Sequence, residues 1–244
     1  MIDTALLLGL LEAKDDPTWT ERLFRLAHSL GFDQMLYGVV PSRHVRFETA
    51  FTRTNYSREW RKRYDANGFV YADPTVAHCV ANTLPLIWAP ATFGNGVPSA
   101  LYEEASAHGV RSGVTLPIHG PQGELGMISF ASDMQPGAQF ERALLEALPA
   151  LSLVRDYAFA SSGRFREARP DPELPRLTRR ELEVLQWVMA GKSSWEVARI
   201  TGCSEATVNF HLANVRQKFG VSTRQQAVVK AIALGLLTPE DHHR

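Results

Sequence analysis

The chain has 244 residues, 45% of them hydrophobic and 21% charged, a composition that indicates a globular protein and excludes a disordered or low-complexity one. Its formal net charge is zero, but residues 1–173 carry 16 Lys and Arg against 20 Asp and Glu, whereas residues 174–244 carry 10 against 6. The basic C-terminal part is a candidate for contact with phosphates, although so small an excess is also typical of an ordinary solvated surface.

The N-terminal run LLLGLL (6–11) predicts one face of a first helix, because it is short, follows Asp3 and is soon followed by acidic residues. We expect neither a signal peptide nor a membrane span. Cys79 and Cys203 fall in different predicted domains, without a CxxC pair or a metal-ligand spacing. This pattern predicts a soluble protein of the reducing cytoplasm, with no disulfide framework and no metal site.

Apolar stretches at 35–40 and 124–130 read as strands, and they are separated by helical patterns at 17–30, 56–66, 99–108 and 137–160. This alternation predicts an α+β or α/β layered domain. From residue 161 the sequence SSGRFREARPDPELPRL holds three prolines and no apolar period, as a solvated linker does. We therefore place one domain at 1–163, a linker at 164–176 and a second domain at 177–244.

The second domain contains four helix-start signals, each followed by a glycine that stops the helix. In chain order they are Thr178 with Glu181 and Gly191, Ser193 with Glu196 and Gly202, Ser204 and Gly220, and Ser222 with Gln225 and Gly235. Helices two and three are joined by the tight turn 201–203, the spacing of a helix-turn-helix. The sequence therefore predicts an all-α domain of four short helices.

The third of these helices has a buried stripe and a polar outer face. The stripe consists of Val208, Leu212, Val215 and Phe219, and the outer face carries Asn209, Ala213, Arg216 and Gln217. An Asn can read an adenine edge in the major groove, and Arg216 and Lys218 are placed to meet phosphates. A four-helix protein-interaction module would show the same capping signals, so these signals alone do not establish DNA binding.

Residues 177–231 resemble the LuxR-type helix-turn-helix almost without gaps, including Glu181, Leu185, Gly191 and the segment TVNFHLANVRQKFGV. The resemblance implies binding to double-stranded promoter DNA. The candidate DNA-binding residues are Lys192, Thr207, Asn209, Ala213, Arg216, Gln217 and Lys218.

The first 60 residues lack the acidic pair and phosphoacceptor pattern of a receiver domain. The segments DPTVAHC, EEASAHG and LPIHGPQGELG of the first domain instead resemble the acyl-homoserine-lactone receptors of quorum sensing, as does one set of spaced residues. That set is Trp60, Tyr64, Asp73, Pro74, Trp88 and Gly113. The resemblance implies an α-β-α sandwich sensor that binds an N-acyl-homoserine lactone and uses no cofactor.

Such a ligand needs a few placed polar groups inside an apolar pocket. The resemblance implies that the Trp60 indole donates to the lactone carbonyl and that Asp73 accepts from the amide N–H. Donors to the amide carbonyl would be Tyr56 and Ser129, and donors to a 3-oxo group would be Thr75 and Arg61. Further candidate lining residues are Leu36, Gly38, Tyr64, Val76, Trp88, Leu125 and Met127.

These residues also have ordinary structural interpretations. Trp60 and Tyr64, one helical turn apart, are common core aromatics, and Asp73 before Pro74 is a common helix cap. Gly113 is expected to be a backbone constraint, and Cys79 a small apolar filler. The small Gly38, with Ala50 and Ala105, favours a long acyl chain.

An enzyme is the competing class of function, because lactones are hydrolysable, but HxHxDH, HExxH and GxSxG patterns are absent from the sequence. A nearer alternative is an orphan regulator of the same fold that responds to a different small molecule. We expect a homodimer on two-fold symmetric DNA, with the stripe Phe140, Leu144, Leu148, Leu151 and Tyr157 as its contact in the sensor.

Overall fold

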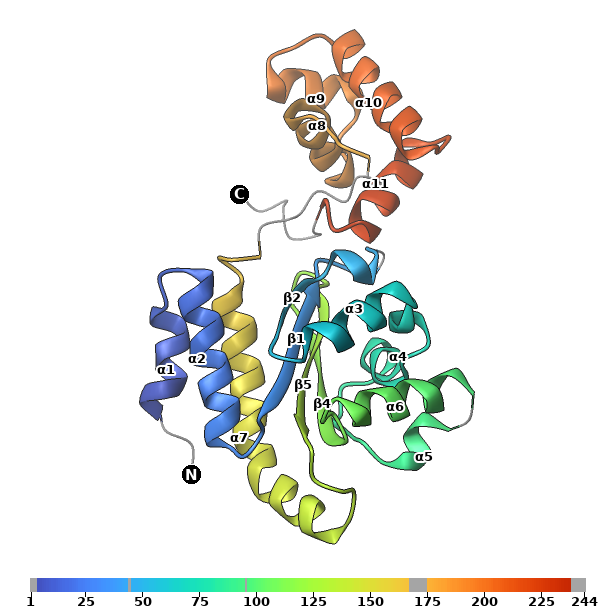
Figure 1. Ribbon diagram of the computed structural model, residues 1–244. Coiled ribbons are helices and arrows are strands. Elements are labelled where there is room, and N and C mark those ends of the chain that lie inside the picture. The colour runs from blue at the N-terminus through green and yellow to red at the C-terminus, as the bar shows by residue number, and fades with distance from the viewer. Residues whose placement is uncertain (1–3, 44, 95, 167–174, 238–244) are drawn as a thin grey trace. The chain divides into compact units, whose positions relative to one another are not determined.

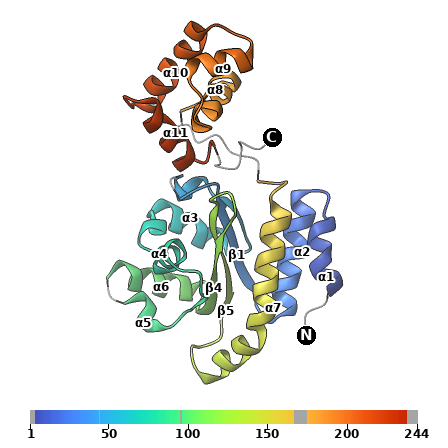
Figure 2. The same ribbon diagram turned by 180° about the vertical axis from the view of Figure 1, so that it is seen from behind.

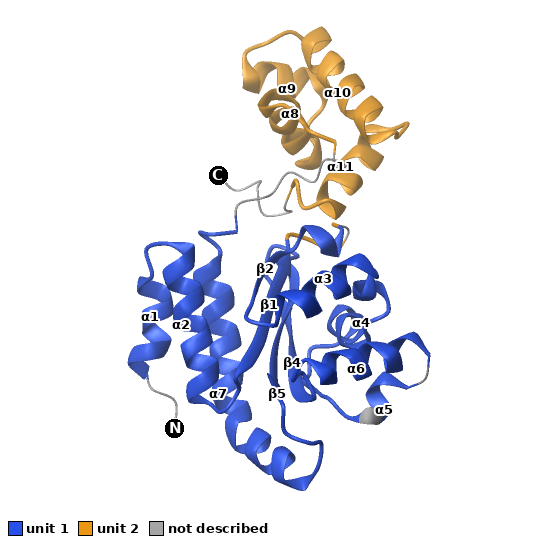
Figure 3. Cartoon of the chain, viewed as in Figure 1, with its two compact units in different colours: residues 1–40, 46–168 blue, residues 41–45, 169–244 orange. Residues whose placement is uncertain are grey.

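The computed structural model describes residues 4–43, 45–94, 96–166 and 175–237. The chain divides into two units, residues 1–40 with 46–168 and residues 41–45 with 169–244 (Figure 3). In the described part, no helix is long and apolar enough to cross a membrane.

The first unit is an antiparallel five-stranded sheet, in the order β2-β1-β5-β4-β3, between two layers of helices. Its elements are α1 (Thr4–Glu12), α2 (Asp16–Ser29), β1 (Gln34–Val40), η1 (Phe47–Thr49), β2 (Phe51–Thr54), α3 (Arg58–Ala66), η2 (Phe69–Tyr71), α4 (Pro74–Ala81), β3 (Leu86–Ile87), α5 (Pro90–Phe93), α6 (Val97–Ala107), β4 (Ser112–His119), β5 (Leu125–Ser132) and α7 (Ala138–Ser162). Helices α1, α2 and α7 cover one face of the sheet and α3 to α6 the other (Figures 1 and 2). The expected α-β-α sandwich is confirmed.

The four helical patterns correspond to α2, α3, α6 and α7, and the N-terminal apolar run lies in α1. The sequence reading gave Asp73 as a helix cap but no helical pattern for the eight residues of α4, and it missed β4, which contains Pro117. A proline argues against a central strand, but β3 pairs only with Val114 and Thr115. Pro117 therefore occupies an edge position of the sheet, where the missing N–H leaves no ladder bond unmade.

The two faces of the sheet pack against different layers. Alternation turns Tyr37, Val114 and Ile128 into the core cluster beneath α1, α2 and α7. Ala131, on the opposite face of β5, packs in a second cluster with Trp60. The side chains of Leu36, Leu125, Met127 and Ser129, with Gly38 between them, therefore face the α3–α6 layer.

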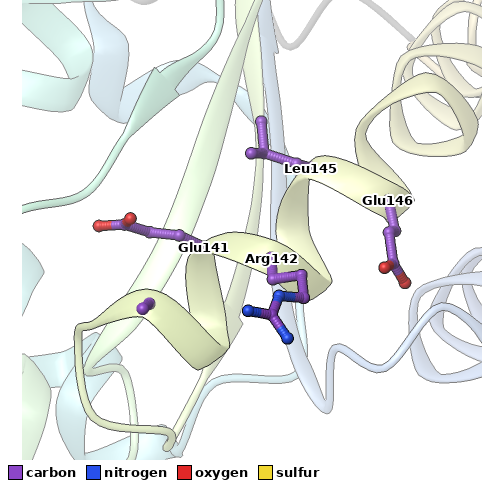
Figure 4. Close-up of a pocket in the computed structure, with 5 residues that line it drawn as sticks. Glu141, Arg142, Leu145 and Glu146 are labelled. Carbon is purple, nitrogen blue, oxygen red and sulfur yellow. The ribbon is translucent and has the colours of Figure 1, made fainter.

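Three of the five stripe residues on α7 are unavailable for the dimer contact that the sequence predicted, while Leu148 and Tyr157 are half-buried. Phe140, Leu144 and Leu151 are buried in the core of their own unit, where they cover the sheet. The exposed leucines of α7 are Leu145 and Leu153. Leu145 belongs to a shallow depression on the outside of the helix (Figure 4), lined by Ala138, Glu141, Arg142, Leu145 and Glu146. All five lining residues are exposed and come from one helix, so the depression encloses no ligand.

The second unit contains four helices, α8 (Arg179–Met189), α9 (Ser194–Thr201), α10 (Glu205–Phe219) and α11 (Arg224–Ala233). Thr178 with Glu181 and Ser193 with Glu196 form capping boxes, and Ser204 caps α10. The expected all-α domain is confirmed.

The start signal of the last helix was assigned one residue too early. Thr223 caps α11 and Gln226 closes its capping box, instead of Ser222 and Gln225. Ser and Thr are both good N-caps and two glutamines follow, so the local sequence does not distinguish the two registers.

Candidate functional site

The α3–α6 side of the sheet carries a buried tryptophan whose polar atom is unused. Trp60 is 3% exposed, and Ser57, the N-cap of α3, accepts a hydrogen bond from its backbone N–H at 3.2 Å. Its indole packs edge-on against Tyr64 and at a tilt against Phe69. Among the described residues the indole N–H has no hydrogen-bond partner. An unpaired donor of this kind is available to a ligand oxygen.

Asp73 lies beside this aromatic cluster and caps α4. Its Oδ1 accepts from the backbone N–H of Thr75 at 2.8 Å and from the Thr75 hydroxyl at 2.7 Å, and Oδ2 accepts from the Tyr64 hydroxyl at 2.9 Å. Burial raises the pKa of Asp73, although these hydrogen bonds act in the opposite direction. The ordinary cap interpretation is therefore correct, and the same carboxylate retains lone pairs for a further donor.

Tyr56 belongs to the same electrostatic environment. Burial raises the pKa of its phenol, and the charge of Asp73 raises it further, while the charge of Arg61 lowers it. Its hydroxyl makes no hydrogen bond within the described ranges. The structure thus brings together two unpaired donors, Tyr56 and Trp60, and one carboxylate acceptor.

Two expected donors to a 3-oxo group are already engaged. The Thr75 hydroxyl donates its proton to Asp73, and Arg61 pairs with Asp65 at 2.6 Å while lying 5.0 Å from the centre of the Tyr64 ring. This exposed pair uses only Nη2 of Arg61, so its other N–H groups remain available to a ligand.

A chain of hydrogen bonds joins side chains of β4 and β5 to Trp88. The sequence predicted Trp88 and Ser129 as site residues but not the third member of this chain, Thr115. The Trp88 indole donates to Thr115 Oγ1 at 2.9 Å, and Thr115 Oγ1 lies 2.9 Å from Ser129 Oγ. If Thr115 donates to Ser129, the serine proton stays free for a ligand acceptor. Thr115 was missed because β4 was missed. Its register opposite Ser129 is a property of the paired strands and not of either segment alone.

Gly113 and Cys79 fit the supporting roles expected of them. A Cβ at Gly113 would lie 2.7 Å from the Trp88 ring, so the indole packs directly on the backbone. Cys79 is buried, and burial raises the pKa of its thiol to about 12, which keeps it protonated and unreactive. Val76 is half-buried on α4 beside it.

The second unit presents α10 as an outward-facing helix. Its stripe of Val208, Leu212, Val215 and Phe219 is buried, whereas Asn209, Thr207, Ala213 and Gln217 are exposed. Ser194 of α9 donates to Asn209 Oδ1 at 2.8 Å, which leaves the amide NH₂ free. Phe210, which sequence reasoning did not select, is 61% exposed beside Asn209. The sequence gave no signal for it, since an aromatic on a helix is usually buried.

The cationic candidate DNA-binding residues of this unit differ in how strongly they are bound to other parts of the protein. Arg216 donates to the Ser222 carbonyl at 3.2 Å, and Lys192 lies 3.6 Å from Glu196; both contacts are at the surface. Lys218, expected to meet phosphates, instead donates to Glu181 Oε2 at 2.6 Å and to the Arg176 carbonyl at 3.0 Å. It directly precedes the buried Phe219, so its side chain lies on the flank of α10 that faces α8. Lys218 thus links α10 to Glu181 of α8 and to the segment before that helix.

A buried apolar site with unpaired donors and a separate helix-turn-helix unit define a ligand-binding transcription regulator. The autoinducer binding domain family matches residues 15–162, and the luxR family of bacterial regulatory proteins matches residues 175–231. The transcriptional activator VanR of Vibrio anguillarum is 33% identical over 215 residues, 88% of each chain, and AnoR of Acinetobacter nosocomialis is 31% identical over 242 residues, 95% of this chain and 97% of its own. SdiA in complex with octanoyl-rac-glycerol has a TM-score of 0.69 and 28% identity, covering 99% of this chain and 96% of its own.

The chain therefore belongs to the LuxR family of transcription regulators, with an N-terminal autoinducer binding domain. Its relatives are transcription regulators and not enzymes. Among the described residues, no group of His, Cys, Asp and Glu is arranged to hold a metal ion.

Proposed function

We propose that this chain is a cytoplasmic quorum-sensing regulator that binds a long-chain 3-oxo-acyl-homoserine lactone and then binds promoter DNA as a homodimer. The supporting observation is the cluster of Trp60, Tyr56 and Asp73, which offers two unpaired donors and one acceptor inside an apolar layer. An acyl-homoserine lactone presents two carbonyls and one amide N–H near its ring. The two donors and one acceptor of the site therefore match the two carbonyls and one N–H near the lactone ring.

The acyl tail would run along the sheet away from this cluster. Leu36, Leu125 and Met127 supply apolar wall there, and Gly38 leaves space, because a Cβ at Gly38 would meet nothing closer than 3.7 Å. Met127 pairs directly with Gly38 across the strands. A flexible methionine opposite a glycine gives a wall that can adapt to a long chain.

The second candidate is a regulator of the same fold that takes a different acylated molecule. The similarity to SdiA bound to octanoyl-rac-glycerol favours it, since that ligand has neither a lactone nor an amide. Mass spectrometry of the ligand retained by the protein after purification from a lactone-producing host distinguishes the two. An acyl-homoserine lactone at one per chain supports the proposal, and an acylglycerol or other lipid under the same conditions supports the alternative.

Asp73→Asn should weaken lactone binding by about 1.5–3 kcal/mol, because a charge-assisted acceptor for the amide N–H becomes neutral. Asparagine also caps helices well, so α4 should remain folded. Trp60→Phe, which removes one neutral donor, should cost less. Isothermal titration measures both effects, and the control is Asp156→Asn, an exposed partner of Arg155 on α7. Parental affinity in both variants would place the ligand elsewhere.

Asn209→Ala should relax base preference at one position in each half-site, with a loss of about 1–3 kcal/mol for the preferred base only. The reason is that its free NH₂ and the second lone pair of its Oδ1, which already accepts from Ser194, can pair with an adenine edge. Binding to a library of operator variants measures the effect, with the exposed Gln225→Ala of α11 as control. Equal losses on specific and random DNA would assign Asn209 to backbone contact instead.

A further inference from the structure

His108 contacts the Trp60 indole from a different element of the fold. It is the C-cap residue of α6, half-buried, and its imidazole stacks on the indole with ring centroids 6.0 Å apart and planes 24° apart. The other two rings that contact the indole, Tyr64 and Phe69, belong to the same short stretch of chain as Trp60. Among the described residues, His108 therefore ties the ring to α6 through an aromatic contact.

His108 is itself held in place at its ring and at its backbone. Its Nδ1 lies 3.3 Å from Ser57 Oγ, the atom that also accepts the Trp60 backbone N–H. Because Ser57 Oγ already accepts that amide, its own proton is available to Nδ1, which favours the tautomer with hydrogen on Nε2. The His108 carbonyl accepts from Gln34 Nε2 at 3.2 Å.

Gly109 allows this approach of the Gln34 side chain. Its φ is +80°, and a Cβ there would lie 2.7 Å from Gln34 Nε2. The backbone that carries His108 is thus fixed to the end of β1, independently of α3.

We infer that His108 is a positioning residue for Trp60 and sets the preference of the site for the lactone ring. This inference rests on the proposed function. A hydrogen bond weakens steeply when its donor turns away from the acceptor. The indole must therefore be held in one orientation to donate well to a carbonyl in one position. The stacked imidazole supplies that restraint, and the link through Ser57 fixes the imidazole to the start of the helix that carries the tryptophan.

The test compares two probes on the purified full chain: a long-chain 3-oxo-acyl-homoserine lactone and the matched N-cyclopentyl amide, which lacks the lactone carbonyl. His108→Ala should weaken binding of the lactone about 3- to 10-fold, the range expected for loss of one aromatic pair. It should leave the affinity for the cyclopentyl amide unchanged. His108→Phe keeps a ring on the indole and should restore most of the lactone affinity.

Trp60→Phe provides the matching background. If His108 acts through the indole, His108→Ala should cost almost nothing further in the Trp60→Phe protein. His28→Ala is the control, since His28 is an exposed histidine of α2. Equal losses for both probes, or additive losses in the double variant, would show a general packing role and overturn the inference. If the parent protein binds neither probe, the proposed function is wrong. If the parent binds the lactone and His108→Ala binds it with the same affinity, only this inference is wrong.

Discussion

Lys218→Met should destabilise the helix-turn-helix unit by about 2–4 kcal/mol, the largest effect expected from a single surface-accessible residue of this chain. Glu181 is 2% exposed, and Lys218 donates to its Oε2 at 2.6 Å. Removing the ammonium would leave a buried carboxylate with a single capping bond, which it accepts from the backbone N–H of Thr178. We place the cost below that of a fully buried pair because the Lys218 side chain is 35% exposed.

Native-state hydrogen exchange of amides in α8 and α10 of the full chain measures this loss. The matched control is Lys192→Met, whose partner Glu196 is exposed, so that its effect should stay within about 1 kcal/mol. Glu181→Gln combined with Lys218→Met removes the buried charge and should recover part of the loss. A Lys218→Met protein that exchanges like the parent, yet binds DNA of every sequence more weakly, would return Lys218 to the phosphate contact first expected.

The same ion pair gives the unit a pH dependence. Burial raises the pKa of Glu181, but the hydrogen bonds from Lys218 and Thr178 outweigh it, and the net pKa is lowered from 4.5. A carboxyl with a lowered folded-state pKa stabilises the fold above its unfolded pKa, and this stabilisation is lost as the pH falls through the folded value. Unfolding of α8 and α10 should therefore become easier below about pH 4.5, and Lys218→Met should flatten that slope.

Gly113→Ala should destabilise the sensor unit by about 2–3 kcal/mol. A Cβ would lie 2.5 Å from the Phe130 carbonyl oxygen and 2.7 Å from the Trp88 ring. The carbonyl has little freedom to move, since the flanking residues are paired in the β4–β5 ladder, so the indole would have to shift and strain its hydrogen bond to Thr115. The variant should lose ligand affinity together with stability.

Thermal unfolding without ligand measures the first of these effects, and titration of the folded variant measures the second. Gly38→Ala is the control for thermal unfolding, because it adds the same methyl group to a strand that faces the same layer but meets ordinary contacts at 3.7 and 3.8 Å. If Gly113→Ala melted like Gly38→Ala, the close packing of Trp88 on the β4 backbone would be wrong.

What the sequence predicted well about this protein depends on residues close together in the chain. The capping boxes at Thr178 and Ser193, the stop at Gly202 and the buried stripe of α10 are all made by side chains within one or two helical turns, so their spacing already encodes them. Asp73 before Pro74 likewise gave a correct helix cap. The family resemblance added Trp60 and the sensor fold, which local rules do not supply.

Contacts between distant segments were decided only by the tertiary structure. The pairing of Lys218 with Glu181 spans 37 residues and the stacking of His108 on Trp60 spans 48 positions of the numbering, and neither is visible as a period or a motif. The register of β4 against β5 chose Thr115 as the partner of Ser129, and the sheet itself covered the α7 stripe that resembled a dimer contact. An apolar stripe specifies that a face must be buried but not against what, because hydrophobic burial has no direction of its own until the other elements are in place.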